Sequence, residues 1–280
     1  MPSLVGSEMC IRDRVRWRAD GDTPRHIRKH GLGENVTLLS GDLLDQGSLA
    51  NVIAKSKPDI VFHLAAQSFV PRSFNYPGET YSTNTTGTMN LLEAIRNQNI
   101  TPKFIFAGSS EEYGLVYSNK KQYSKFIKER GNLFPEPEKI PELPINENNP
   151  LRPMSPYALS KVQGDYMVRS YFMCSKIPTV VSRAFNHEGA GRGSMFVSSV
   201  IAKQVSQIKN KGIQEGIEIG NVNSFRDWSH VEDIVKGYCL LADKGVPGEV
   251  YNQGSQRTDS ILTYISVSYT HLTLPTNREV

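Results

Sequence analysis

A tyrosine and a lysine separated by three residues, Tyr157 and Lys161, offer the most specific chemistry in this sequence. Four residues along a helix are slightly more than one turn, so the two side chains would share one face. An ammonium near a phenol favours the phenolate, and we therefore expect a lowered pKa for Tyr157, which would let it exchange protons nearer neutral pH. The alternative is an exposed tyrosine beside a solvated lysine.

A segment rich in serine and glutamate, AGSSEEYG at 107–114, directly follows the apolar run KFIFA. Hydroxyls at the carboxyl end of a parallel strand face the ligand crevice of an open α/β sheet. One of the two serines, Ser109 or Ser110, is therefore predicted to hydrogen-bond a substrate oxygen beside Tyr157. Standing alone, the segment would be no more than a turn of serine and glycine, but together with Tyr157 and Lys161 it indicates a catalytic centre.

These side chains need a scaffold, and helices alternate with near-continuous apolar strands along the first two thirds of the chain. We predict strands over 36–39, 59–64, 103–107 and 179–183, and helices over 46–56, 83–97 and 157–171. This alternation is typical of a parallel sheet covered on both faces. The predicted fold class is α/β, with a doubly wound Rossmann-like sheet that binds ligands at the carboxyl ends of its strands.

Two further regions differ from this pattern. After Asn186 we predict a helix around 196–209, a strand at 216–219 and a helix near 232–241, which together suit a smaller C-terminal substrate lobe. The segment 115–150 is rich in Lys, Glu, Pro and Asn. Because its prolines exclude a regular helix or a central strand, we interpret it as an enlarged surface loop near the site.

Composition indicates a soluble globular enzyme. The 280 residues are 38% hydrophobic and 21% charged, with a net charge of +4. No apolar run is long enough to cross a bilayer and no signal sequence is evident, so we expect a cytoplasmic protein that binds neither membrane nor nucleic acid. The cysteines Cys10, Cys174 and Cys239 are scattered and odd in number, which indicates reduced thiols and no metal site.

The combination of strand, serine and Tyr-x-x-x-Lys resembles the extended short-chain dehydrogenases/reductases, the NAD-dependent epimerase/dehydratase family. Further matches over about residues 15–262 are GDLLD at 41–45, HLAAQS at 63–68, NTTGT at 84–88 and PMSPY at 153–157. The resemblance implies that Asp42 and Leu43 contact the adenine of the cofactor. It further implies that the cofactor lies against Leu64, Ala65, Ala66, Tyr157, Lys161 and His187.

The segment RAFNHE at 183–188 is similar to enzymes that act on GDP-sugars, above all the GDP-mannose 4,6-dehydratases. The resemblance implies that the substrate is held by Asn186, Glu188, Arg192, Asn221 and Arg226. The two arginines would bind the nucleotide diphosphate, a role that suits their bidentate guanidinium forks. For either arginine, the alternative is a surface salt bridge.

The same resemblance implies a catalytic set of Ser109, Glu111, Tyr157 and Lys161. Tyr157, assisted by Ser109, would deprotonate the C4 hydroxyl as hydride passes to NADP, and the hydride would later return to C6. Glu111 would take the C5 proton as water leaves C6, which requires a raised pKa of the kind that burial provides. Glu112 is the competing carboxylate and is expected to point elsewhere. The product would be GDP-4-keto-6-deoxy-mannose.

The start of the chain departs from the family pattern, because no Gly-x-x-Gly-x-x-Gly phosphate loop precedes the predicted strands. The chain enters at VRWR (15–18), which looks like the end of a second strand, where Arg16 or Arg18 would meet the 2′-phosphate of NADP. We therefore expect the first strand and phosphate loop to be missing. A chain without them is predicted to bind NADP poorly and to be inactive.

The two ends, 1–14 and 266–280, resemble translated adaptor sequence, and we interpret them as non-native. The predicted domains are then a partial NADP-binding Rossmann domain over 15–185, which carries the loop 115–150, and an interleaved partial substrate lobe over 186–265.

Three alternatives to the dehydratase remain open. SSVIAKQ at 198–204 is closer to the GDP-4-keto-6-deoxy-mannose reductases, which makes a reductase the second interpretation. Another sugar-nucleotide epimerase or dehydratase is the third. A different class is a catalytically silent nucleotide-binding protein that senses redox state, against which the set of Ser109, Tyr157 and Lys161 argues. The resemblance further implies a homodimer or homotetramer, built through the helices at 83–97 and 157–171.

Overall fold

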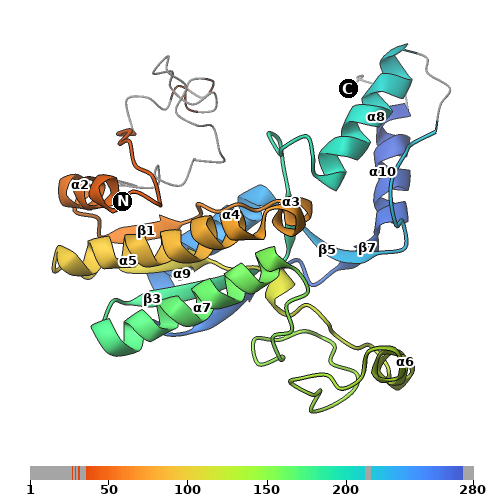
Figure 1. The fold of residues 1–280 in the computed structure, drawn as a ribbon. Helices are drawn as coiled ribbons and strands as arrows, with labels where there is room; N and C mark the ends of the chain where they lie inside the picture. The colour runs from red at the N-terminus through yellow and green to blue at the C-terminus, as the bar shows by residue number, and fades with distance from the viewer. Residues whose placement is uncertain (1–26, 28, 30, 32–35, 212–215, 274–280) are drawn as a thin grey trace. The chain divides into compact units, whose positions relative to one another are not determined.

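The structure is a computed structural model that describes residues 27, 29, 31, 36–211 and 216–273 (Figure 1). The chain divides into two compact units. The first unit contains the chain up to Arg183 and the returning segment Tyr238–Asn252, and the second unit contains Ala184–Gly237 and the chain from Gln253 onward. Within the described ranges, no helix is long and apolar enough to cross a membrane.

The first unit is built on a four-stranded sheet. Its strand order is β1 (Ile60–His63), β2 (Lys103–Ala107), β3 (Thr179–Ala184) and β6 (Val250–Gln253). Strands β1 and β3 both run parallel to β2, with Ile60 opposite Lys103 and Phe104 opposite Thr179. The α/β prediction with a Rossmann-like parallel sheet is therefore confirmed. Because the strands are parallel, the residues that follow β1, β2 and β3 lie at one edge of the sheet.

Helices cover both faces of this sheet, as Figure 1 shows. The described helical elements of the first unit include α2 (Gln46–Ser56), α3 (Val70–Asn75), α4 (Pro77–Tyr81), the π-helical turn η3 (Ser82–Thr86), α5 (Gly87–Asn97), α7 (Pro156–Ser175) and the second half of α9 (Val231–Lys244). Phe104 and Phe106 of β2 face the core shared with α2, α5 and α7. Ile105, which points to the opposite face, packs with Val180 and with Leu241 of α9.

Helix α7, which carries the tyrosine and the lysine, has well-defined ends and a close contact with β2. Ser155 caps its first turn through a hydrogen bond to the N–H of Ala158, and Lys176 ends it in the left-handed conformation at φ 57°. A Cβ atom on Gly164 would lie 2.3 Å from a ring carbon of Phe106. The glycine therefore lets the helix lie directly against the strand.

Two predicted strands are absent. The structure gives no strand at 36–39 or at 216–219, although both segments are apolar. A strand requires a hydrogen-bonded neighbour, and no described strand pairs with either segment. Ile217 and Ile219 pack against an apolar cluster of the second unit instead. By contrast, the predicted bounds of α2 and β2 agree with the structure to the residue.

The inserted segment 115–150 is not entirely a loop, because it contains helix α6 (Lys120–Arg130). Asn119 accepts a hydrogen bond from the N–H of Gln122 at the start of this helix, and Gly131 ends it at φ 83°. Its apolar face consists of the half-buried Tyr123, Phe126 and Ile127, and the first two pack on the ring of Tyr117. Three apolar side chains among charged residues are a weak periodic signal, which is why this helix was not predicted.

The two ends of the insert are hydrogen-bonded to each other. The N–H of Leu115 donates to the carbonyl of Arg152 at 3.2 Å, and the N–H of Arg152 donates to the carbonyl of Tyr113 at 3.3 Å. Arg152, which follows the insert, forms an ion pair with Glu142 inside it at 2.8 Å, with both side chains at most 3% exposed. The insert is thus a closed loop anchored by a buried ion pair.

The second unit combines a small sheet with its own helices. Strand β4 (Asn186–Glu188) runs parallel to β5 (Phe225–His230), and β7 (Thr258–Ser260) is antiparallel to β5. Its helices are α8 (Val197–Lys211), the first half of α9, and α10 (Ile261–Thr273), which continues past residue 265. Apolar side chains of α8 and α10, among them Ile201, Val205 and Ile261, form its core.

Candidate active site

Strand β2 delivers Ser109 to the start of a short turn. Ser109 caps the 3-10 helix η4 (Ser110–Glu112): its Oγ accepts the N–H of Glu111 at 3.2 Å, while Glu112 Oε1 accepts the N–H of Ser109 at 2.7 Å. A Cβ atom on Gly108 would lie 2.6 Å from Glu112 Oε1 and 2.9 Å from the carbonyl oxygen of Ser182. Glycine is therefore required between the strand and the turn.

Helix α7 brings Tyr157 and Lys161 to the same place. Tyr157 is half-buried, and its side chain hydrogen-bonds with that of Ser109. Lys161 is buried, and its Nζ donates to the carbonyl oxygen of Ala107 at 2.6 Å and lies 5.9 Å from the centroid of the Tyr157 ring. Ser109, Tyr157 and Lys161 thus meet at the carboxyl end of β2.

The electrostatics of Tyr157 differ from the sequence prediction. Burial raises the pKa of Tyr157, and this outweighs the lowering effect of the hydrogen bond with Ser109; the charges of Glu111 and Glu112 raise the pKa further. The prediction of a lowered pKa is therefore wrong for the protein without ligands. The physical reason is that the Lys161 ammonium is bonded to the Ala107 carbonyl and is itself destabilised by burial, which lowers its pKa to about 8.

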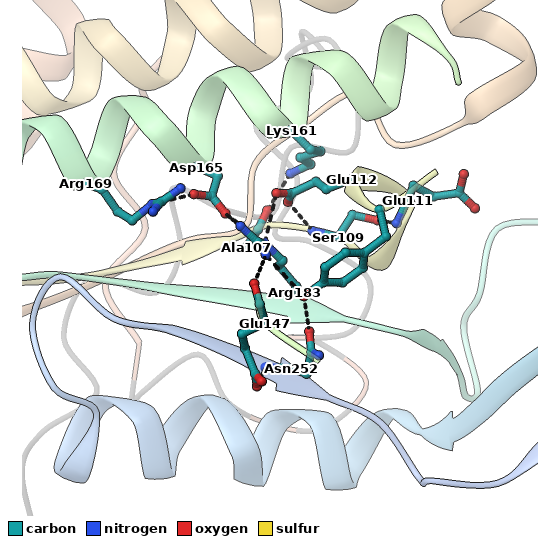
Figure 2. Close-up of polar contacts among 11 residues, drawn as sticks. Ala107, Ser109, Glu111, Glu112, Glu147, Lys161, Asp165, Arg169, Arg183 and Asn252 are labelled. Carbon is teal, nitrogen blue, oxygen red and sulfur yellow. Dashed lines mark hydrogen bonds and ion pairs between the residues drawn. The ribbon is translucent and has the colours of Figure 1, made fainter. Parts of the chain in front are cut away.

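The two adjacent glutamates have different surroundings, which Figure 2 makes visible. Glu112 is fully buried and its Oε2 lies 3.2 Å from Arg183 Nε. Glu111 is half-buried, and its carboxylate points away from Arg183. Burial was expected at Glu111, but Glu112 is the buried glutamate of the pair. Of the two, Glu111 has the larger electrostatic effect on Tyr157.

A buried ionic network behind the site was not predicted. Asp165 of α7 is fully buried and accepts from Arg183 Nη2 at 2.8 Å and from Arg169 Nε at 2.7 Å. Arg183 also donates to the hydroxyl of Tyr113 at 3.1 Å. The sequence does hold a signal for this network, since Lys161, Asp165 and Arg169 are spaced by four residues and so share one face of the helix.

The turn after β1 is tied to α7 by one side chain. Asn84 of η3 accepts the N–H of Gln67 at 2.7 Å, donates to the carbonyl of Gln67 at 3.0 Å and donates to Ser160 Oγ at 2.9 Å. The predicted cofactor residues Leu64, Ala65 and Ala66 lie just before Gln67, at the same edge of the sheet as Ser109. Two alanines leave room for a ligand to approach the backbone.

The structure gives less information on the residues that were predicted to contact the adenine end of the cofactor. Asp42 is exposed and its carboxylate accepts the N–H of Leu44 at 2.9 Å, while the Leu43 carbonyl accepts from Asn90 Nδ2 at 2.8 Å. Arg16 lies outside the described residues. The described residues fit the ribose-nicotinamide half of a dinucleotide, because the hydroxyl of Ser109, the phenol of Tyr157 and the ammonium of Lys161 can bind sugar hydroxyls beside the small-residue turn.

In the second unit, the predicted residues on β4 divide between two faces. Successive side chains of a strand alternate, so Asn186 and Glu188 share one face and His187 takes the other. His187 Nδ1 is 2.9 Å from the carbonyl oxygen of Phe185. This separation is compatible with the different roles expected of Asn186 and His187.

The predicted phosphate-binding arginines have unequal surroundings. The Arg192 guanidinium lies 3.9 Å from the centroid of the Phe196 ring, and its Nε is 3.4 Å from Glu188 Oε2. Arg226, on β5, is exposed, and its Nη1 donates to the carbonyl of Phe225. Asn221 is exposed as well. Arg192 therefore has an ion-pair partner in the predicted substrate residue Glu188, whereas Arg226 is open to solvent.

Comparisons with known proteins agree with this geometry. The model of the NAD dependent epimerase/dehydratase family matches residues 14–254. A GDP-mannose 4,6 dehydratase of Drosophila melanogaster is 31% identical over 242 residues, which are 86% of this chain and 55% of that protein. A GDP-6-deoxy-D-mannose reductase of Pseudomonas aeruginosa is 30% identical over 227 residues, which are 81% of this chain and 67% of that protein.

A solved structure has a similar fold. The structure of RMD from Pseudomonas aeruginosa complexed with NADPH matches with a TM-score of 0.74 and 28% identity, over 86% of this chain and 75% of that one. The chain spans about half the length of the curated dehydratases that it matches.

Proposed function

The chain belongs to the NAD dependent epimerase/dehydratase family, and we propose that it dehydrates GDP-mannose to GDP-4-keto-6-deoxy-mannose with a bound NADP. The observation that carries this proposal is the meeting of Ser109, Tyr157 and Lys161 at the carboxyl end of β2, with Glu111 two residues beyond the serine. The likeness to proteins named GDP-mannose 4,6-dehydratase supports the choice of substrate.

In the proposed reaction Tyr157 takes the proton of the C4 hydroxyl, and Ser109 holds the same oxygen by a hydrogen bond. A bound nicotinamide cofactor supplies the hydride acceptor that oxidation at C4 requires. Because burial raises the pKa of Tyr157, its phenolate needs a nearby positive charge. The ammonium of Lys161, now bonded to the Ala107 carbonyl, provides that charge from the next turn of the same helix.

Glu111 performs the elimination in this scheme. The C4 ketone acidifies the C5 proton, which the Glu111 carboxylate takes and passes to the departing C6 hydroxyl, so that water leaves and a C5–C6 double bond forms. Return of the hydride to C6 and uptake of a proton at C5 would complete the product. Glu111 is half-buried in the structure without substrate. A sugar placed against it would remove its remaining water and raise its basicity, as desolvation does for any carboxylate.

A reductase acting on the 4-keto-6-deoxy sugar is the second candidate, and one observation favours it. A ketone reductase needs a protonated phenol that donates to the C4 oxygen, and the raised pKa of Tyr157 keeps the phenol protonated. Sequence identity does not separate the two candidates, since it is 30% to the Pseudomonas aeruginosa reductase and 31% to the Drosophila dehydratase. In this candidate Glu111 has no catalytic role.

The test is incubation with NADP and GDP-mannose in deuterated water, followed by NMR of the sugar. It is run on the full 280-residue chain. A 4-keto-6-deoxy product with deuterium at C5 is expected. Unchanged GDP-mannose, together with NADPH-dependent reduction of the 4-keto-6-deoxy sugar, would establish the reductase instead. Tight binding of NADP without turnover of either sugar would support the redox sensor.

Two variants separate the roles within the dehydratase scheme. Glu111→Gln should stop dehydration while leaving hydride transfer from C4, seen as cofactor reduction that does not proceed to product. Tyr157→Phe should slow both hydride transfer and dehydration, by a factor of about 10² to 10⁴. If Glu111→Gln lost hydride transfer from C4 as fully as Tyr157→Phe does, Glu111 would have no separate role in the elimination.

A further inference from the structure

Glu112, which has no role in the reaction proposed above, fixes the turn that carries Ser109 and Glu111. Its Oε1 accepts the N–H of Ser109 at 2.7 Å, and the Ser109 hydroxyl in turn accepts the N–H of Glu111. The Glu112 side chain is fully buried, so this hydrogen bond has no competition from water. The position of the Ser109 hydroxyl therefore depends on the carboxyl group of Glu112.

The second oxygen of this carboxyl group is in an unusual environment. Glu112 Oε2 is buried and accepts no hydrogen bond from any donor among the described residues, although Arg183 Nε is 3.2 Å away. The same guanidinium is already engaged by Asp165, at 2.8 Å from Nη2 and 2.9 Å from Nε. Two fully buried carboxyl groups thus share one buried guanidinium.

Two negative charges in this position would repel each other, and a buried oxygen without a hydrogen bond is costly. A single proton on Glu112 Oε2 removes both problems, since it cancels one charge and turns the oxygen into a donor towards Asp165. We propose that Glu112 is a positioning residue of this site, which holds the Ser109 turn with one carboxyl oxygen and shares a proton with Asp165 through the other. Its effect on catalysis rests on the function proposed above.

The charges around Glu112 support this assignment. The titratable and charged groups that interact with Glu112 come from α7 and β3, namely Tyr157, Lys161, Asp165 and Arg183. Arg169 forms an ion pair with Asp165, and the Glu111 carboxylate points away. Burial and then the charge of Asp165 raise the pKa of Glu112 well above its ordinary range, and Arg183 opposes them only in part. In Figure 2 Glu112 lies between Lys161 and Arg183.

Infrared spectroscopy of the 280-residue chain tests the proton without any substrate. At about pH 7 an exposed carboxyl group is ionised, so a carbonyl band of a protonated carboxylic acid reports a buried one. The wild type should show such a band, and Glu112→Gln, which keeps an oxygen for the Ser109 N–H, should lose it. Absence of the band in the wild type, or its survival in Glu112→Gln, would overturn the proposal.

Turnover tests the positioning role, with Glu112→Gln and Glu112→Leu as a matched pair. Leucine removes the acceptor for the Ser109 N–H and should lower kcat about tenfold or more relative to glutamine, with little change in KM. Glutamine should retain most of kcat but lose the pH dependence that arises from the shared proton. Equal kcat in the two variants would contradict the positioning role. If the wild type turns over neither sugar, the proposed function fails, while the infrared result still decides the proton.

Discussion

Lys161 should make the stability of the protein depend on pH in a direction set by its burial. Burial lowers its pKa from 10.5 to about 8, so between these values the unfolded chain binds a proton that the folded chain does not. Protonation therefore destabilises the fold below about pH 8, and this cost disappears as the pH rises towards 10. The two pKa values differ by an amount equivalent to about 3 kcal/mol.

The comparison that isolates this effect is the wild type against Lys161→Met. The free energy of unfolding of the wild type, relative to that of the variant, should rise by up to about 3 kcal/mol between pH 7 and 10. Urea unfolding curves at several pH values measure it. A difference that does not vary with pH would show that Lys161 keeps its ordinary pKa.

Still at the scale of residues, the sequence predicted which side chains meet but not their charge states. Ser109, Tyr157 and Lys161 belong to short local patterns, one at the end of an apolar run and one along a helix. The pKa of Tyr157 depends on desolvation and on which carbonyl Lys161 bonds, and both are tertiary facts. For the same reason Asp165 went unnoticed and Glu112 was considered only as a carboxylate that competes with Glu111, because in a sequence a buried carboxylate looks like a solvated one.

At the scale of elements, the packing of α7 on β2 depends on Gly164. A Cβ atom there would lie 2.3 Å from Phe106, a ring buried in the core. Gly164→Ala should therefore destabilise the protein by about 1–3 kcal/mol despite the better helix propensity of alanine. Gly78→Ala in α4 is the control, since nothing lies within 4 Å of its Cβ position, and it should be neutral or stabilising. Thermal unfolding of both variants measures the difference. Equal melting temperatures would show that Gly164 is not needed for the packing of α7 on Phe106.

The insert should depend on its buried ion pair. Arg152→Ala leaves the carboxylate of Glu142 buried without its cation, at a cost of about 3–5 kcal/mol. The double variant Arg152→Met with Glu142→Leu should recover part of this loss, but not all, because Glu142 also accepts the N–H of Tyr117. Limited proteolysis within 115–150 should be faster in Arg152→Ala than in the double variant. The opposite order would mean that the pair does not hold the insert.

The elements that sequence reasoning found and missed differ in what stabilises them. Helix α2 and strand β2 have apolar patterns of their own and were predicted to the residue. The segments 36–39 and 216–219 have apolar patterns as well, but a strand exists only through a partner, which a single segment does not reveal. Helix α6 has only three half-buried apolar residues, Tyr123, Phe126 and Ile127, and their partner Tyr117 lies outside the helix, so the helical pattern is weak in the sequence.

At the scale of the whole molecule, the first unit is completed by a segment from far along the chain. Leu241 and the partly buried Tyr238 and Tyr251 cover the face of the sheet formed by Ile105 and Val180. A chain that ends at Arg183 should therefore not unfold cooperatively, because this apolar face stays in water. The same chain joined by a short linker to residues 238–252 should regain a cooperative transition and near-UV circular dichroism. Cooperative unfolding of the chain that ends at Arg183 would show that the returning segment is dispensable.

The hydrogen bonds between Leu115 and Arg152 have a consequence for how this protein can change over evolutionary time. A loop whose two ends touch can be lengthened, shortened or exchanged without moving the residues on either side of it. The entropic cost of closing such a loop grows only with the logarithm of its length, so each doubling adds about 0.6 kcal/mol. The part of the insert around α6 is therefore a site where lineages can acquire or exchange a module, and where a foreign peptide can be grafted, while the neighbouring Ser109 turn stays in register. Ile145 and Glu147 have to be kept, because they accept hydrogen bonds from Asn252 and Arg183.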